Sequence, residues 1–426
     1  MFSLPYKHYS LRCAAGIILS AGVFAAGQTP APAAPAAGTD AQAPAPPAAP
    51  ATPPPAPTWS VGPMDLSGFI DGYYSFNFNR PNTQFENWDQ VNQLYNFNDK
   101  TDQFELSAAK LTLNHDPDPI GAHVDFIYGR TNELINKAPS NTTLYEGFSD
   151  AYVSEPDQLP YLEQAFLSLK PPKAKGFEMD FGKFVTSAGA EVIEAKDNWN
   201  YSRSLLFVNA IPYWHFGLRT SMPVSKTETI GFQLVNGWNN VSKANGGVTG
   251  VFTSALVKPK FSLNVNYIVG PENYDTSSGL RNLIDATLLL TPPGKVNAYL
   301  NYDYGANQDS LFNCTSGTEP ETCGDTRLHD WWGAAGAVHI QADGKNAIAM
   351  RGEYFDDPDG YQTGTPQSLY EGTFTYEYKW VEGMLTRVEY RIDQSSTNYF
   401  HKLSSQYTDQ QQTITVGFIA FFGPKR

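Results

Sequence analysis

The sequence predicts an all-β fold, a transmembrane antiparallel up-and-down β-barrel of about sixteen strands, because two patterns recur along the chain. The first pattern is an alternation of apolar and polar residues over about ten positions, which is typical of a membrane barrel wall. In the last such segment, 412–422, Ile414, Val416 and Phe418 share one face, and Thr413 and Thr415 share the other. Successive strand side chains point to opposite faces, so each segment has one apolar and one mostly polar face.

The second pattern is the length of the connections between the sixteen candidate strands, which strictly alternates between short and long. The short connections have the Pro, Gly and Asp content of tight turns and lie at 116–119, 171–176, 224–227, 259–260, 292–294, 342–345 and 381–383. The long connections lie at 80–103, 131–158, 187–211, 240–250, 271–281, 306–328, 357–367 and 394–410. Outer-membrane barrels have short periplasmic turns and long external loops, so we expect both the N-terminus and the C-terminus to be periplasmic.

The chain divides into three parts by composition. Residues 1–27 have the features of a secretory signal peptide: a basic start with Lys7 and Arg12, then an apolar stretch too short to span a membrane as a helix. Residues 28–58 are dominated by Ala and Pro and are expected to form a disordered linker. Residues 59–426 then form the barrel domain.

The charge balance is acidic and limits the possible partners. The chain has 29 Lys and Arg residues against 43 Asp and Glu residues, a net charge of −14, which becomes −16 when the signal peptide is removed with its two basic residues. An acidic chain of this kind argues against nucleic acid as a partner. Aromatic residues make up 14% of the sequence, which fits the girdles of Tyr, Trp and Phe that flank the apolar band of membrane barrels.

Two cysteines, Cys314 and Cys323, remain after the signal peptide and lie in one polar connection. In the oxidising compartment that a signal peptide implies, their spacing suits a disulfide that closes the loop. A metal site would need more ligands nearby than His329, so we predict no metal and no cofactor.

Several strands carry charged residues on the face opposite the apolar one. A charge that faces lipid at the bilayer centre is costly, so these side chains are expected in the lumen. The long connection 187–211 is also rich in charge, and it either folds inward and narrows the lumen or forms a solvated external loop. The candidate pore-lining residues from both sources are Glu191, Glu194, Lys196, Asp197, Arg203, Arg219, Arg351, Glu353, Arg387, Glu389 and Arg391.

Enzymatic function has little support in the sequence. The chain has no Gly-x-Ser-x-Gly elbow, no His-Glu-x-x-His motif and no phosphate-binding loop, and its seven histidines are scattered. We therefore assign no catalytic residues.

Several segments resemble the OmpL-like family of outer-membrane β-barrel porins. These segments are 67–81, 182–186, 189–194, 200–207, 212–219, 351–356 and 387–393, and the resemblance spans roughly residues 66–422. It implies an outer-membrane location, contact with outer-membrane lipid and recognition by the barrel-assembly machinery through a C-terminal Phe, here Phe422.

The expected function is that of an outer-membrane porin through which small hydrophilic solutes diffuse. The acidic residues of the 187–211 segment predict a mild preference for cations, and a second copy of the chain, in a homo-oligomer, is among the partners considered. Two alternatives stay open: a substrate-selective channel, for example for sugars, which an inward line of aromatic residues would favour, and a secreted all-β binding protein.

Overall fold

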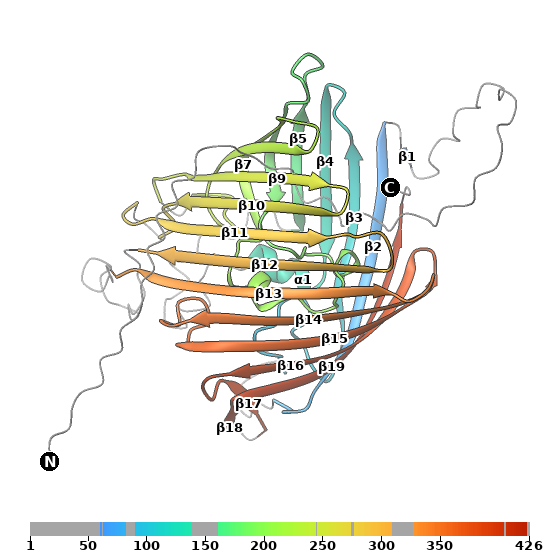
Figure 1. The fold of residues 1–426 in the computed structure, drawn as a ribbon, viewed down its shortest axis with the longest axis vertical. Coiled ribbons are helices and arrows are strands. Elements are labelled where there is room, and N and C mark those ends of the chain that lie inside the picture. Colours follow the sequence, from blue (N-terminus) through green and yellow to red (C-terminus); the bar gives the residue numbers. More distant parts are fainter. Residues whose placement is uncertain are drawn as a thin grey trace, which may run out of the picture.

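The protein is a closed antiparallel β-barrel (Figure 1). The structure, a computed structural model, describes residues 60–61, 63–81, 90–137, 161–243, 245–273, 277–308, 327–403 and 406–423. The sixteen strands of the wall are β2 (Met64–Asn77), β3 (Phe104–His115), β4 (Ile120–Tyr128), β5 (Leu162–Leu169), β6 (Glu178–Val185), β7 (Trp214–Pro223), β8 (Glu228–Val235), β9 (Thr249–Lys258), β10 (Phe261–Gly270), β11 (Arg281–Leu290), β12 (Val296–Asn307), β13 (His329–Gln341), β14 (Asn346–Asp357), β15 (Gln367–Val381), β16 (Met384–Ser395) and β19 (Gln410–Phe422).

Each strand of the wall pairs with its sequence neighbour, and the first and last strands close the barrel. Residues 413–422 of β19 pair with 68–77 of β2, for example Thr415 with Ser75. The short strand β1 (Ser60–Val61) adds to β2, and β17 (Phe400–Lys402) pairs with β18 (Gln406–Thr408) in the last long connection. Because closure leaves no free edge, every strand can satisfy its backbone hydrogen bonds within the wall, as a bilayer requires.

The strands occur where the sequence predicts them, and the connections alternate in length as expected. The seven short turns follow β3, β5, β7, β9, β11, β13 and β15, and the eight long connections follow β2, β4, β6, β8, β10, β12, β14 and β16. The predicted fold class and strand number are therefore confirmed.

The two faces of the wall also follow the sequence pattern. On β19, Ile414 and Phe418 point outward, and Phe418 is 50% exposed, as expected for a side chain that lipid would cover. On β2, Asp71 and Ser75 point inward and are buried, while Ile70 is 59% exposed on the outside. The apolar face is thus the outer one and the polar face lines the interior.

Strand β3 departs from simple alternation because it contains a β-bulge. Asp71 pairs with Ala108 and Gly72 pairs with Leu106, so that Ser107 is an extra residue. A bulge shifts the alternation by one position. This explains why the apolar residues of β3 do not all share one sequence parity.

In β6, Lys183 occupies one of the alternate positions whose apolar side chains point outward, yet the Lys183 side chain is completely buried. Its ammonium donates to Asn136 Oδ1 (2.7 Å) in helix α1 (Arg130–Lys137) and to the Leu162 carbonyl (2.8 Å), and lies 3.9 Å from the centre of the Trp214 ring. These contacts keep the charge away from lipid.

A hydrophobic core lies inside the barrel, and most of it is towards the long connections. Ile135 of α1 and Leu205 of the short helix α2 (Leu205–Asn209) belong to it, together with Trp331 of the wall and Phe97 of the first long connection. Among the described residues, no helix is long and apolar enough to cross a membrane. The predicted signal peptide, the whole predicted linker, Cys314 and Cys323 lie outside the described residues, so the disulfide stays a prediction.

Candidate functional site

The segment 187–211 lies inside the barrel and runs along most of its height. Near the long-connection ends of the strands, the Trp331 indole N–H donates to the Ala210 carbonyl (3.2 Å). Near the short turns, Arg387 donates to the Ala195 carbonyl. Of the two alternatives for this segment, the structure therefore has the inward one.

Local interactions give the segment its shape. The Asn198 side chain bonds to both the amide (2.9 Å) and the carbonyl (2.7 Å) of Val192, which closes a turn that includes the 3₁₀ element η3 (Ala195–Asp197). Ser204 caps α2 because its hydroxyl accepts from the Phe207 amide (3.0 Å). On the wall, Gly417 leaves the space that the Tyr201 ring occupies.

Carboxylates of the wall accept hydrogen bonds from the backbone of this segment. Glu389 of β16 accepts from the amides of Tyr201 (2.6 Å) and Ser202 (3.0 Å). Glu353 of β14 accepts from the amides of Leu205 (3.0 Å) and Leu206 (3.3 Å) at the start of α2. Each carboxylate thus accepts from two consecutive amides of the loop backbone.

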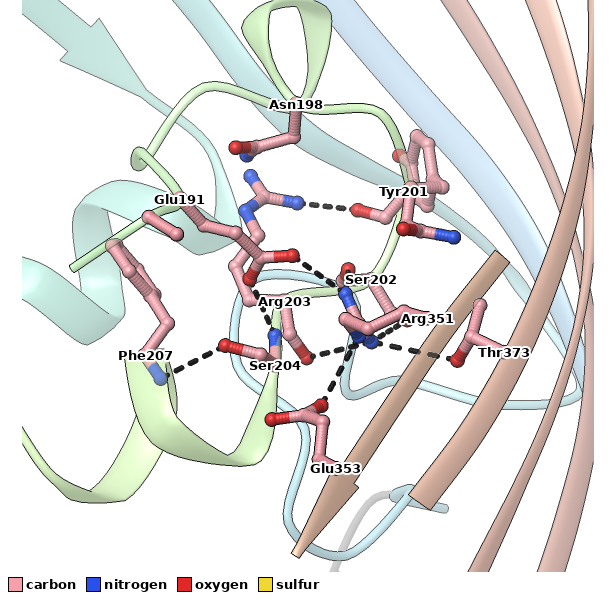
Figure 2. Close-up of polar contacts among 12 residues, drawn as sticks. Glu191, Asn198, Tyr201, Ser202, Arg203, Ser204, Phe207, Arg351, Glu353 and Thr373 are labelled. Carbon is pink, nitrogen blue, oxygen red and sulfur yellow. Dashed lines mark hydrogen bonds and ion pairs between the residues drawn. The ribbon is translucent and has the colours of Figure 1, made fainter. Parts of the chain in front are cut away.

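Arginines of the same wall bind the carbonyls of the segment. Arg351 donates to the Ser202 carbonyl (2.8 Å) and Arg391 to the Arg203 carbonyl (2.7 Å). Figure 2 shows Arg351 and Glu353 next to each other on the β14 side of the stretch that contains Ser202 and Ser204. Side chains of the wall thus bind both amides and carbonyls of this irregular backbone. Without them, these backbone groups would be left unpaired in the interior.

Arg351 is the centre of this network. Its guanidinium contacts three carboxylates, those of Glu191 (2.7 Å), Glu353 (3.1 Å) and Glu371 (3.3 Å), and all four side chains are at most 4% exposed. Glu191 in turn accepts from the Ser204 amide (2.6 Å), as Figure 2 also shows. One cation therefore joins the loop to two strands.

The opposite side of the loop contacts β2 and β3. The Tyr201 hydroxyl donates to Asp71 (2.7 Å), and Glu194 is paired with Lys110. Lys110 also contacts Asp125 (2.8 Å) and Glu163 (2.6 Å). Burial alone would raise the pKa of Glu194, but the ammonium groups of Lys110 and Lys196 outweigh it and hold this pKa below its ordinary value.

Two further loop groups are strongly affected by burial. The pKa of the Tyr201 phenol is raised well above its ordinary value by burial and by the adjacent Asp71 carboxylate. Burial lowers the pKa of Arg203, although Asp71 and other acids partly offset this. Arg203 donates to the Tyr201 carbonyl (2.6 Å) and to that of Ile193, so its role is to hold the loop's own fold.

The structure brings ten of the eleven predicted site residues into or against this loop. Seven are buried in the contacts described above: Glu191, Arg203, Arg351, Glu353, Arg387, Glu389 and Arg391. Glu194, Lys196, Asp197 and Arg219 are partly exposed. Lys196 pairs with Asp197, whereas Arg219 lies apart and pairs with Asp180 (2.8 Å). Their part in solute passage stays a prediction.

The sequence analysis missed several residues of the network: Lys110, Asp71, Glu163 and Glu371. The alternation along β15 could have predicted that Glu371 points inward. Tyr370 and Phe374 occupy the other set of alternate positions, and both point outward. Lys110 shares a face with Thr112 opposite Leu111 and Leu113, but the bulge at Ser107 interrupts the alternation over the whole of β3. Within the described ranges, no group of three or more His, Cys, Asp or Glu residues could hold a metal ion.

The fold and the inward loop define an outer-membrane porin-type barrel. The chain belongs to the family described as "Putative beta-barrel porin-2, OmpL-like", which matches residues 63–422. A search of curated proteins finds no match to the sequence. The resemblance seen in the sequence is confirmed, and with it the outer-membrane location.

Solved structures with the same fold are outer-membrane proteins. One is a loop L8 deletion mutant of OmpT from Vibrio cholerae, with a TM-score of 0.50 and 10% identity, covering 84% of this chain and 99% of that one. Another is an anion-selective porin from Comamonas acidovorans, with a TM-score of 0.50 and 9% identity, covering 84% and 99%. At these identities the likeness shows the barrel fold alone.

Proposed function

We propose that this protein is a porin through which small hydrophilic solutes diffuse, along a path bordered by the 187–211 loop. The observation that carries the proposal is the loop held inside a closed barrel by the network around Arg351. A segment fixed by buried ion pairs narrows the lumen without needing a mobile gate. Reconstitution of the detergent-purified protein into planar bilayers tests this: discrete, ohmic current steps are expected, and their absence in an inserted, folded barrel would refute it.

A mild preference for cations is the selectivity we propose. It rests on the net charge of −14 and on the acids of the loop. The ion pairs of the loop weaken the preference, since Glu191, Glu194 and Asp197 each have a basic partner. Asp197 is 28% exposed against 4% for Glu191, so it acts on passing ions more directly.

Reversal potentials in a potassium chloride gradient should distinguish these two acids. Asp197→Asn is expected to reduce the cation preference more than Glu191→Gln, because the Glu191 charge is buried against Arg351. Lys196→Gln, which removes the partner of Asp197, is expected to increase the preference. A preference for chloride in the wild type, or potentials that none of the three variants changes, would contradict the proposed selectivity.

The orientation we propose puts both termini in the periplasm and the long connections outside. Trypsin added to intact cells is then expected to cut at the exposed Lys402, in the last long connection, and to spare Lys173 and Lys345 in the short turns. Disrupted cells are the control, in which Lys173 and Lys345 become accessible. Cleavage at these two lysines in intact cells, with Lys402 protected, would reverse the orientation.

A further inference from the structure

A cluster of three rings lies at the end of the loop nearest the short turns. Trp199, which follows η3, lies over two rings of the wall: its centroid is 5.2 Å from that of Tyr299 on β12 and 5.5 Å from that of His339 on β13. His339 pairs with Asn297 close to the ends of both strands, so the cluster is near the periplasmic mouth of the proposed path. Trp199 and His339 both remain partly exposed.

The cluster has unused hydrogen-bonding capacity. Within the part of the chain that the structure describes, His339 Nδ1 is buried without a hydrogen-bond partner, and no hydrogen bond of the Trp199 indole N–H is recorded there. Buried polar atoms are normally paired. The partly exposed Trp199 indole and the exposed part of the His339 ring are the groups that a polar solute in the lumen can reach.

The charged groups around the cluster are already paired. Glu377 of β15 binds Arg387 (2.8 Å), and both residues interact electrostatically with His339. Lys196 and Asp197, next to Trp199 in the loop, pair with each other. A charged solute would have to compete with these ion pairs, whereas a neutral group with hydroxyls can donate to the carboxylates and accept from the bases without separating them.

We propose that Trp199, Tyr299 and His339 form a subsite for a neutral sugar ring, so that the solutes of this porin include saccharides. A pyranose has an apolar face of C–H groups that packs on an aromatic ring, and hydroxyls at its edge that suit the Trp199 N–H, the His339 ring and the Glu377–Arg387 pair. This inference rests on the proposed porin function, because the subsite faces the path of diffusion.

The test is the effect of maltose on the ion current of single channels in potassium chloride. For the wild type, maltose is expected to reduce the current in a saturable way. Trp199→Leu removes the ring and is expected to raise the half-saturating concentration about tenfold, as the loss of about 1.4 kcal/mol of stacking would. Trp199→Phe keeps a ring and should lose less. Trp380→Leu is the matched control, because Trp380 is 52% exposed on the outer face of β15, and it should leave the block unchanged.

The outcomes separate this inference from the porin function. If a folded barrel gives no channels, the porin function itself fails. If it conducts but maltose has no effect, or if the block is equal in wild type and Trp199→Leu, the sugar subsite is overturned and the porin function stands. A block by tetraethylammonium in place of maltose also overturns it, since the rings would then act as a site for cations.

Discussion

Replacing Arg351 with methionine is expected to lower the free energy of unfolding by about 3–5 kcal/mol, the cost of removing one partner from a buried ion network. The change leaves Glu191, Glu353 and Glu371 close together without their shared cation. It also removes the bond to the Ser202 carbonyl, so the Glu353 contacts with Leu205 and Leu206 alone should hold the loop to β14. We expect larger and noisier current steps, together with a lower urea midpoint measured by the mobility of unheated samples on gels.

Two variants make this result specific. Arg351→Lys keeps the charge but cannot form the forked contacts of a guanidinium, so its stability should lie between those of the wild type and Arg351→Met. Arg130→Met breaks an ion pair with Asp99 at the rim, where Arg130 is 21% exposed, and should cost no more than about 1 kcal/mol. If Arg351→Met is as stable as Arg130→Met and conducts like the wild type, the network does not hold the loop.

Excision of the inward loop is expected to increase the single-channel conductance several-fold and to admit larger solutes. The excision is feasible because the two ends of the loop are adjacent: the Thr186 amide donates to the Tyr213 carbonyl (2.9 Å), so a tight turn can replace the residues between them. The barrel wall should persist, since its strands pair with one another independently of the loop. Liposome swelling with sugars of increasing size measures the change in the exclusion limit.

The matched control for the excision is the connection between β8 and β9. Shortening it across 241–248 leaves the 187–211 loop and its contacts with β14 and β16 in place, so the conductance should stay close to that of the wild type. An equal conductance after excision of the 187–211 loop would mean that ions do not pass beside it, and the proposed path would have to be abandoned.

Most of the wall could be predicted because its signals are local. The alternation in 412–422 assigns Phe418 to the outside and Thr415 to the inside without reference to any other strand, and β19 follows it. The alternation of short and long connections likewise needs only the turn residues between strands. Local prediction was incomplete at β3, where Ser107 shifts the parity, and at Lys183, where a distant helix covers a charge that the pattern would leave facing outward.

The position and the contacts of the inward loop could not be predicted from the sequence. Glu191 and Arg351 were both expected to matter, but nothing in either local pattern shows that they bind each other across 160 positions (2.7 Å). A polar segment such as 187–211 can be solvated outside or buried inside, and the balance depends on whether every buried charge and backbone group finds a partner.

The sequence by itself therefore determined the class of fold, the number of strands and, for most strands, the face that points to the membrane, because the side chain at each position must suit either lipid or the interior. Only the tertiary structure decided the position of the loop. Its stability comes from Glu353, Glu389 and the arginines of β14 and β16, whose carboxylates and guanidinium groups match the loop backbone only after the barrel has closed.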